Sequence, residues 1–239
     1  MPKEVFTKIF RGERSEKRYQ NEVDAFNLFP HLVPAIISAN DQLMEISFER
    51  ITGDSHECSP ETLTAIGETL ATVHRNHHRA SEWKRSHLTE RYRAFRDKDL
   101  AALFEQVSSA IKQPVYGLTH GDYRRRNILS TPEGIKVVDW EFFGTNFVYW
   151  DLAIFSGDYV HQKFHGAQTN SLQPFWEGYL SQIELTDEEI ALCKTLGALD
   201  IIADHVLVQP AEKPPEPEEL FVDFSDQEKE YLLDHRNYD

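Results

Sequence analysis

Residues 117–144 read GLTHGDYRRRNILSTPEGIKVVDWEFFG, and this stretch carries the strongest structural and chemical signals in the chain. Two short apolar runs, at 128–129 and 135–138, are separated by the turn-forming residues STPEG. Apolar runs that flank such a turn are typical of a β-hairpin. The segment therefore predicts two antiparallel strands with polar residues next to them.

Three oxygen-bearing side chains lie beside this predicted hairpin. Asp122 and Asn127 are five positions apart on the loop before its first strand, and Asp139 directly follows its second strand. Closing the hairpin brings the three side chains to one edge, where their oxygens suit Mg²⁺ and leave places open for phosphate oxygens. Asp122 would then accept a proton from an attacking hydroxyl group. The alternative is that all three are ordinary turn and cap residues.

The residues before this stretch predict a small lobe of three strands and one helix. The first ten residues alternate as in a strand, and 15–29 repeat apolar side chains at helical spacing. Two short strands are predicted at 35–39 and 43–49, joined by a turn at Asn40-Asp41.

The remainder of the chain predicts mainly helices. Ser59 followed by Pro60 is typical of a helix start, and Thr186 with Glu189 forms a capping box. Further helices are predicted around 100–111 and 172–180. From residue 212 onward there are 10 acidic and 3 basic residues, and we expect this Pro-rich tail to be solvated and poorly ordered.

The composition limits the classes of function. With 25 basic and 40 acidic side chains the formal net charge is −15, which argues against general binding of nucleic acid or anionic membranes. Only Cys58 and Cys193 occur, so we expect neither a disulfide framework nor a cysteine metal site. No signal-peptide or membrane-spanning pattern is visible in the sequence, and we expect a cytoplasmic location.

The motifs together resemble the aminoglycoside phosphotransferase and choline kinase family of small-molecule kinases. HGD at 120–122, followed by Asn127, matches its catalytic loop H-G-D-x-x-x-x-N. DWE at 139–141 matches its metal-binding segment, and YWDLA at 149–153 resembles the segment whose aspartate braces the catalytic loop. The resemblance covers residues from about 8 to about 205.

The resemblance implies an α+β, two-lobed protein-kinase-like fold with a truncated N-terminal β-rich lobe and a mainly helical C-terminal lobe. The expected divisions are a nucleotide lobe at 1–52, a helical catalytic and acceptor lobe at 53–209, and an acidic linker and tail at 210–239.

The resemblance also implies roles for individual residues and the cofactors ATP and Mg²⁺. Asp122 becomes the catalytic base, and Asn127 and Asp139 become the metal ligands. Lys8 and Glu22 resemble the ion pair that holds the nucleotide phosphates. A solubilising strand-edge charge for Lys8 and a solvated helix position for Glu22 are the alternatives.

Two further elements are assigned by the same resemblance. Residues 48–53, FERITG, resemble the hinge between lobes, where backbone groups near Glu49, Arg50 and Ile51 would meet adenine. Arg124 stands where related kinases often place a cation near the transferred phosphate. For its neighbours Arg125 and Arg126, pairing with acidic surface groups is the alternative.

The implied function is transfer of the ATP γ-phosphate to a hydroxyl group of a small molecule: an amino sugar, an amino alcohol or a sugar. The sequence contains no Gly-rich loop to cover the phosphates, so a catalytically silent kinase-like binding module is the alternative. Phosphorylation of a protein side chain is a third possibility. A phosphorylated or acidic acceptor also stays open, because of the arginine run.

Two features bear on the acceptor. Acidic residues, among them Asp200 and Asp204, suggest a negative pocket for a cationic acceptor, against a solvated helix face as the alternative. Trp140, Trp150 and Trp176 suggest a box for a quaternary ammonium group, against core packing as the alternative.

Overall fold

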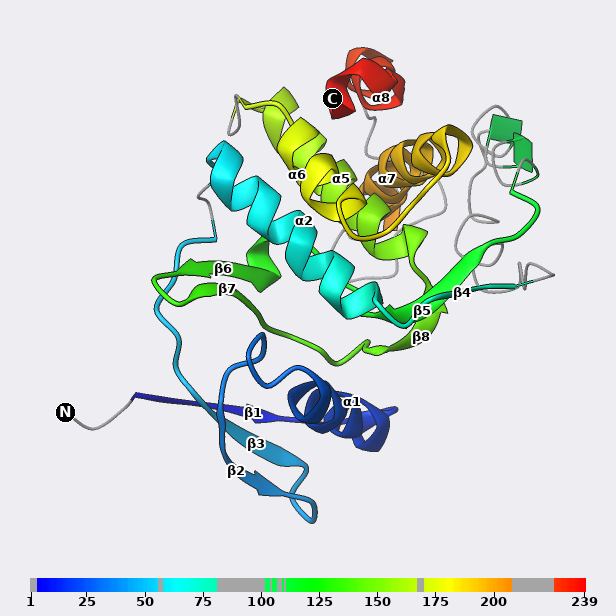
Figure 1. The fold of residues 1–239 in the computed structure, drawn as a ribbon. Helices are drawn as coiled ribbons and strands as arrows, with labels where there is room; N and C mark the ends of the chain where they lie inside the picture. Colours follow the sequence, from blue (N-terminus) through cyan, green and yellow to red (C-terminus); the bar gives the residue numbers. More distant parts are fainter. Residues whose placement is uncertain are drawn as a thin grey trace.

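The computed structural model describes residues 4–55, 58–80, 102–103, 105–106, 109, 111–166, 170–207 and 226–239 (Figure 1). Its α-helices in these ranges are α1 Ser15–Leu28, α2 Pro60–His74, α5 Tyr149–Phe164, α6 Gln173–Leu180, α7 Asp187–Leu207 and α8 Asp226–Leu233. Its strands are β1 Val5–Ile9, β2 Ile36–Asn40, β3 Glu45–Glu49, β4 His78–Arg79, β5 Val115–Thr119, β6 Ile128–Thr131, β7 Gly134–Val137 and β8 Gly144–Phe147. Two short 3₁₀ helices, Arg125–Asn127 and His235–Tyr238, complete the elements.

The predicted lobe of three strands and one helix is confirmed, and its strands form an antiparallel sheet of order β1-β3-β2 with α1 against it (Figure 1). The register pairs Lys8 of β1 with Ile46 of β3. A small separate cluster of buried side chains joins sheet and helix: Phe10, Tyr19, Ile46 and Phe48. The turn between β2 and β3 is closed by Asn40, whose side-chain oxygen accepts hydrogen bonds from the next backbone N–H groups.

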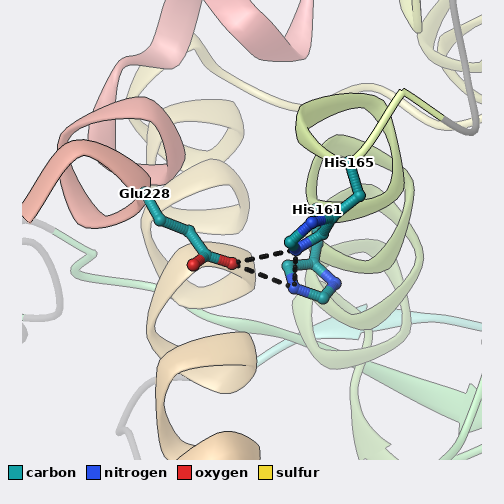
Figure 2. A group of neighbouring side chains, drawn as sticks. All are labelled: His161, His165 and Glu228. Atoms are coloured by element: carbon teal, nitrogen blue, oxygen red, sulfur yellow. Dashed lines mark hydrogen bonds and ion pairs between the residues drawn. The ribbon is translucent and has the colours of Figure 1, made fainter. Parts of the chain in front are cut away.

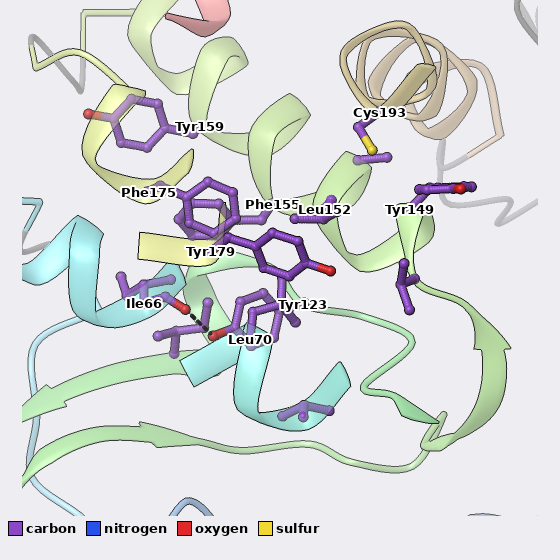
Figure 3. Packing of buried hydrophobic residues seen from close by; sticks show 14 of the residues in the cluster. Ile66, Leu70, Tyr123, Tyr149, Leu152, Phe155, Tyr159, Phe175, Tyr179 and Cys193 are labelled. Atoms are coloured by element: carbon purple, nitrogen blue, oxygen red, sulfur yellow. Dashed lines mark hydrogen bonds between the residues drawn. The ribbon is translucent and has the colours of Figure 1, made fainter. Parts of the chain in front are cut away.

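Two pairs of helices form the larger core, α2 on α6 and α5 on α7 (Figures 1 and 3). Glycines allow the first pair to approach closely. A Cβ atom at Gly67 would lie 2.1 Å from the backbone oxygen of Phe175, and one at Gly178 would lie 2.2 Å from that of Thr64. The predicted helix start is confirmed, because the Ser59 hydroxyl accepts a hydrogen bond from the N–H of Thr62 at 3.2 Å.

The predicted hairpin is confirmed as β6–β7, which pairs Ile128 with Val137 and Thr131 with Gly134. Its closed end lies away from the loop, so the loop and the residue after β7 meet at the other end. There the Val138 N–H donates to the Asn127 carbonyl at 2.9 Å. The sheet β4-β5-β8 is not predicted, because its strands are short and far apart in sequence.

The prediction of a poorly ordered tail is wrong for residues 226–239. These residues form α8 and a final 3₁₀ helix, and Leu232 and Tyr238 are fully buried. The Trp176 indole N–H donates to the Tyr238 carbonyl at 3.0 Å. The acidic composition hides this helix, because its few apolar side chains find their partners only in the tertiary structure.

Two further expectations concern other parts of the chain. The helix predicted around 100–111 falls mostly outside the described residues. Within the described ranges, every helix is too short or too polar to cross a lipid bilayer.

Candidate active site

Asp151, in the first turn of α5, holds the HGD loop in place. Its two carboxylate oxygens accept the backbone N–H groups of His120 at 2.6 Å and Gly121 at 2.8 Å. The imidazole Nε2 of His74 lies 3.2 Å from the same carboxylate, and the other ring nitrogen meets the Tyr179 hydroxyl at 3.0 Å. Asp151 and His74 are fully buried. The loop is therefore positioned from inside the core, and His74 is a core residue.

His120 is a structural residue in this arrangement. Its Nε2 lies 3.0 Å from the Val138 carbonyl, and its ring stands edge-on to Trp140. Burial lowers the pKa of His120 in spite of the Asp151 carboxylate nearby. A neutral imidazole therefore links the HGD loop to the residue just before Asp139.

The Asp122 carboxylate is surrounded by hydrogen-bond donors. Arg124 Nε lies 2.8 Å from Oδ1, while Arg126 Nη2 at 3.2 Å and Asn127 Nδ2 at 3.0 Å contact Oδ2. Burial raises the pKa of Asp122, but the arginines outweigh this effect and the pKa lies below its usual value. The carboxylate is therefore ionised at neutral pH and able to accept a proton.

Arg124 also reaches Asp200 on α7, at 3.0 Å between Nη2 and Oδ2. Asp200 is fully buried, so neither an open negative pocket nor a solvated helix face describes it. The side chain of Asp204 lies outside the described part of the chain. Arg125 is buried rather than on an acidic surface, and it donates to Gln162 and to the Ser55 carbonyl.

Asn127 and Asp139 offer oxygen atoms suited to a hard cation. The amide nitrogen of Asn127 donates both to the backbone oxygen of Asp122 at 2.9 Å and to its carboxylate, so the amide oxygen is the atom that suits a metal. Asp139 has φ of 65°, a left-handed conformation that Asp tolerates better than most residues. Its carboxylate is 39% exposed. The donor set fits Mg²⁺.

Lys8 joins β1, α1 and the segment after β7. Its Nζ lies 2.7 Å from Glu22, contacts Asp139, and lies 3.5 Å from Glu141. Partial burial lowers the pKa of Lys8, but Glu22 and Asp139 outweigh it, and the pKa lies above its usual value. Because Glu22 is buried, it is not a solvated helix residue. The structure thus brings together the lysine and glutamate that the sequence pairs.

A cavity of about 600 Å³ opens beside these groups. Its polar lining includes Lys8, Glu22, Asn127 and Asp139, and the segment 49–51 forms part of its wall. Its apolar lining comprises Val5, Phe6, Pro34, Phe48, Ile51, Leu129 and Val138, of which sequence reasoning missed all but Phe48 and Ile51 of the predicted hinge. The apolar side chains of Val5 and Phe6 at the start of β1 were the available signal, and in the structure they are 52% and 56% exposed.

The tryptophans do not form an open cation box. Trp140 is fully buried, stacks on Phe29, and donates its indole N–H to the Val137 carbonyl at 2.8 Å. Trp176 is also buried and holds the C-terminal segment. Core packing is therefore the use of these two side chains.

Residues 5–189 match the family described as the phosphotransferase enzyme family. None of the curated protein sequences matches significantly.

Several solved structures have the same fold. The choline kinase LicA from Streptococcus pneumoniae is 19% identical, with a TM-score of 0.57 over 99% of this chain and 85% of that chain. An aminoglycoside-3'-phosphotransferase of type VIII is 15% identical, with a TM-score of 0.57 over 81% and 84% of the two chains. An amicoumacin kinase in complex with AMP-PNP and Ca²⁺ is 15% identical, with a TM-score of 0.56 over 95% and 79%.

Proposed function

Because the chain belongs to the phosphotransferase enzyme family, we propose that it transfers the γ-phosphate of ATP to a hydroxyl group of a small molecule. The observation that supports this most directly is the 600 Å³ cavity, in which apolar walls meet Lys8, Asn127 and Asp139. Apolar walls suit the adenine ring of a nucleotide, and a cation beside oxygen ligands suits its phosphates and their metal ion.

Each residue has a proposed task in the transfer. The apolar side chains hold the adenine, and the backbone at Glu49, Arg50 and Ile51 forms its hydrogen bonds. Lys8, oriented by Glu22, binds the phosphates. The divalent-ion complex of a related kinase supports a metal held by Asn127 and Asp139. Bound Mg²⁺ would neutralise phosphate charge.

Asp122 accepts the proton of the acceptor hydroxyl group while the hydroxyl oxygen bonds to the γ-phosphorus. The bond between the γ-phosphorus and the oxygen of the leaving ADP breaks in the same step. Asn127 orients the Asp122 carboxylate through its amide nitrogen. Arg124 lies against the same carboxylate, and we propose that it also stabilises negative charge on the transferred group.

The acceptor class is an amino sugar, an amino alcohol or a sugar. Solved structures of the same fold include kinases named for choline, for aminoglycosides and for aminopropanol. Direct detection of a phosphorylated product, by mass spectrometry with a panel of these acceptors, tests the proposal.

The variants D139A and D122N separate metal binding from proton transfer. We expect D139A to abolish the Mg²⁺-dependent rise of Tm with ATP. D122N should bind nucleotide normally but react about 10²–10⁴-fold more slowly. Glu133, exposed in the turn of the β6–β7 hairpin, provides E133A as a control.

Unchanged product formation in D139A would contradict the assigned site. Nucleotide binding without product from any acceptor would instead favour the silent binding module.

A further inference from the structure

Three side chains of the types that bind metal ions, His161, His165 and Glu228, converge between α5 and α8 (Figure 2). His161 lies in the last turn of α5, His165 directly follows that helix, and Glu228 faces them from α8. Each imidazole Nε2 lies 3.2 Å from the same carboxylate oxygen of Glu228. The two Nε2 atoms lie 3.1 Å apart.

When the Glu228 carboxylate is ionised, hydrogen atoms alone cannot give all three pairs among the two Nε2 atoms and Glu228 Oε1 a favourable hydrogen bond. An imidazole nitrogen carries either a hydrogen or a lone pair. If both Nε2 atoms carry hydrogens, the two N–H groups face each other across 3.1 Å. If one of them lacks its hydrogen, its lone pair faces the lone pairs of Glu228 Oε1 across 3.2 Å. A cation at the centre is attracted to all three atoms at once.

The spacing of the ligand atoms also suits one particular class of metal. A tetrahedral Zn²⁺ bound at about 2.0–2.1 Å places its ligand atoms roughly 3.3–3.4 Å apart. The three distances here, 3.1, 3.2 and 3.2 Å, are close to that value. Two imidazoles and one carboxylate favour Zn²⁺ and similar transition metals over Mg²⁺ or Ca²⁺.

The exposure of the cluster permits entry of an ion. The side chain of His165 is 54% exposed, whereas those of His161 and Glu228 are 18% and 14% exposed. One side is therefore open to solvent, which leaves a fourth position for water. Beside the cluster α5 packs on α8, since the rings of Phe164 and Tyr231 lie 5.2 Å apart and the Phe164 ring also lies 5.2 Å from that of His165.

We propose that His161, His165 and Glu228 bind a divalent transition metal of the Zn²⁺ class, and that this metal fastens the C-terminal helix α8 to α5. The link joins segments 63 residues apart in sequence. It adds to the burial of Leu232 and Tyr238, which hold the same C-terminal segment to the core. Because neither imidazole belongs to the proposed ATP site, metal binding is independent of the proposed function.

The test is titration of metal-free protein with Zn²⁺ by calorimetry, and with Co²⁺ by visible absorption, in excess Mg²⁺ to occupy oxygen-ligand sites. We expect about one equivalent to bind, with the absorption of a low-coordinate Co²⁺ site. H165Q and E228Q should each weaken binding at least about tenfold. Zn²⁺ should also raise the Tm of the wild type more than that of either variant.

Two matched controls make the result specific. E230Q removes the same charge from an exposed position of α8, and H31A removes an exposed histidine elsewhere. Both should bind Zn²⁺ as the wild type does. H165Q changes a half-exposed side chain, so loss of folding does not obscure the result. Absence of Zn²⁺ binding in the wild type would overturn the proposal. So would binding of Zn²⁺ to H165Q and E228Q as tight as to the wild type.

Discussion

Replacement of Asp151 by Asn tests whether one buried carboxylate holds the HGD loop. The two side chains have nearly the same shape, so the variant leaves no cavity. The carboxylate accepts two backbone N–H groups, at 2.6 and 2.8 Å, and also contacts His74 at 3.2 Å. In the variant, one amide oxygen still accepts a hydrogen bond, while the amide nitrogen faces the second backbone N–H donor.

The expected cost follows from these contacts. Loss of a hydrogen bond to a charged group costs about 1.5–3 kcal/mol, and a buried N–H left without an acceptor adds about 1–3 kcal/mol. The free energy of unfolding should therefore fall by roughly 3–6 kcal/mol. For a chain of this size each kcal/mol shifts Tm by about 2–4 °C, so Tm should fall by at least about 6 °C.

The assay is thermal unfolding followed by circular dichroism, with D187N as the control. Asp187 is an exposed residue in the first turn of α7, and its replacement should change Tm by less than about 2 °C. Product formation should fall in D151N together with Tm, because the displaced loop carries Asp122. A decrease in Tm equal to that of the control would refute the reasoning that Asp151 is the anchor of the loop.

Three further variants test other parts of the structure. Burial holds the pKa of His120 below its unfolded value of about 6.5, so the unfolded chain binds more protons and Tm should fall as the pH drops below that value. In H120Q the dependence of Tm on pH should be weaker in this range. The same dependence in H120Q and the wild type would contradict this account of His120. G67A should destabilise the protein by about 1–3 kcal/mol in thermal unfolding, whereas G144A, whose Cβ meets open space, should not; equal effects would exclude close helix packing as the cause. R124Q should raise the pKa of Asp122 and move the acid limb of the kcat/KM profile to higher pH, and an unmoved limb would show that Asp122 is not the titrating base.

Local sequence signals predicted a large part of the fold. Ser59 caps α2, and Thr186 and Glu189 cap each other at the start of α7. These signals work because the interacting groups lie within three residues of each other. The hairpin β6–β7 is predictable for the same reason, since its turn and both strands lie in one short segment.

The candidate site was predictable where residues close in the sequence are also in contact in the structure. Asp122 and Asn127 meet because the 3₁₀ turn Arg125–Asn127 connects them directly. The contact of Lys8 with Glu22 was also expected, because the resemblance to the small-molecule kinases pairs these two residues. The roles given to these residues in phosphate transfer stay predictions.

Contacts between distant segments were decided only by the tertiary structure. Arg124 and Asp200 are 76 residues apart, and His165 and Glu228 are 63 apart. Neither pair has a periodicity or spacing that marks it, because each depends on how α5, α7 and α8 pack. The sequence by itself determined the elements that short-range signals mark, such as α2 and the β6–β7 hairpin, and the HGD-loop motif, because that information is local. Folding determined which buried charges pair and where the C-terminal helix docks, because those contacts form only when separate helices share one core.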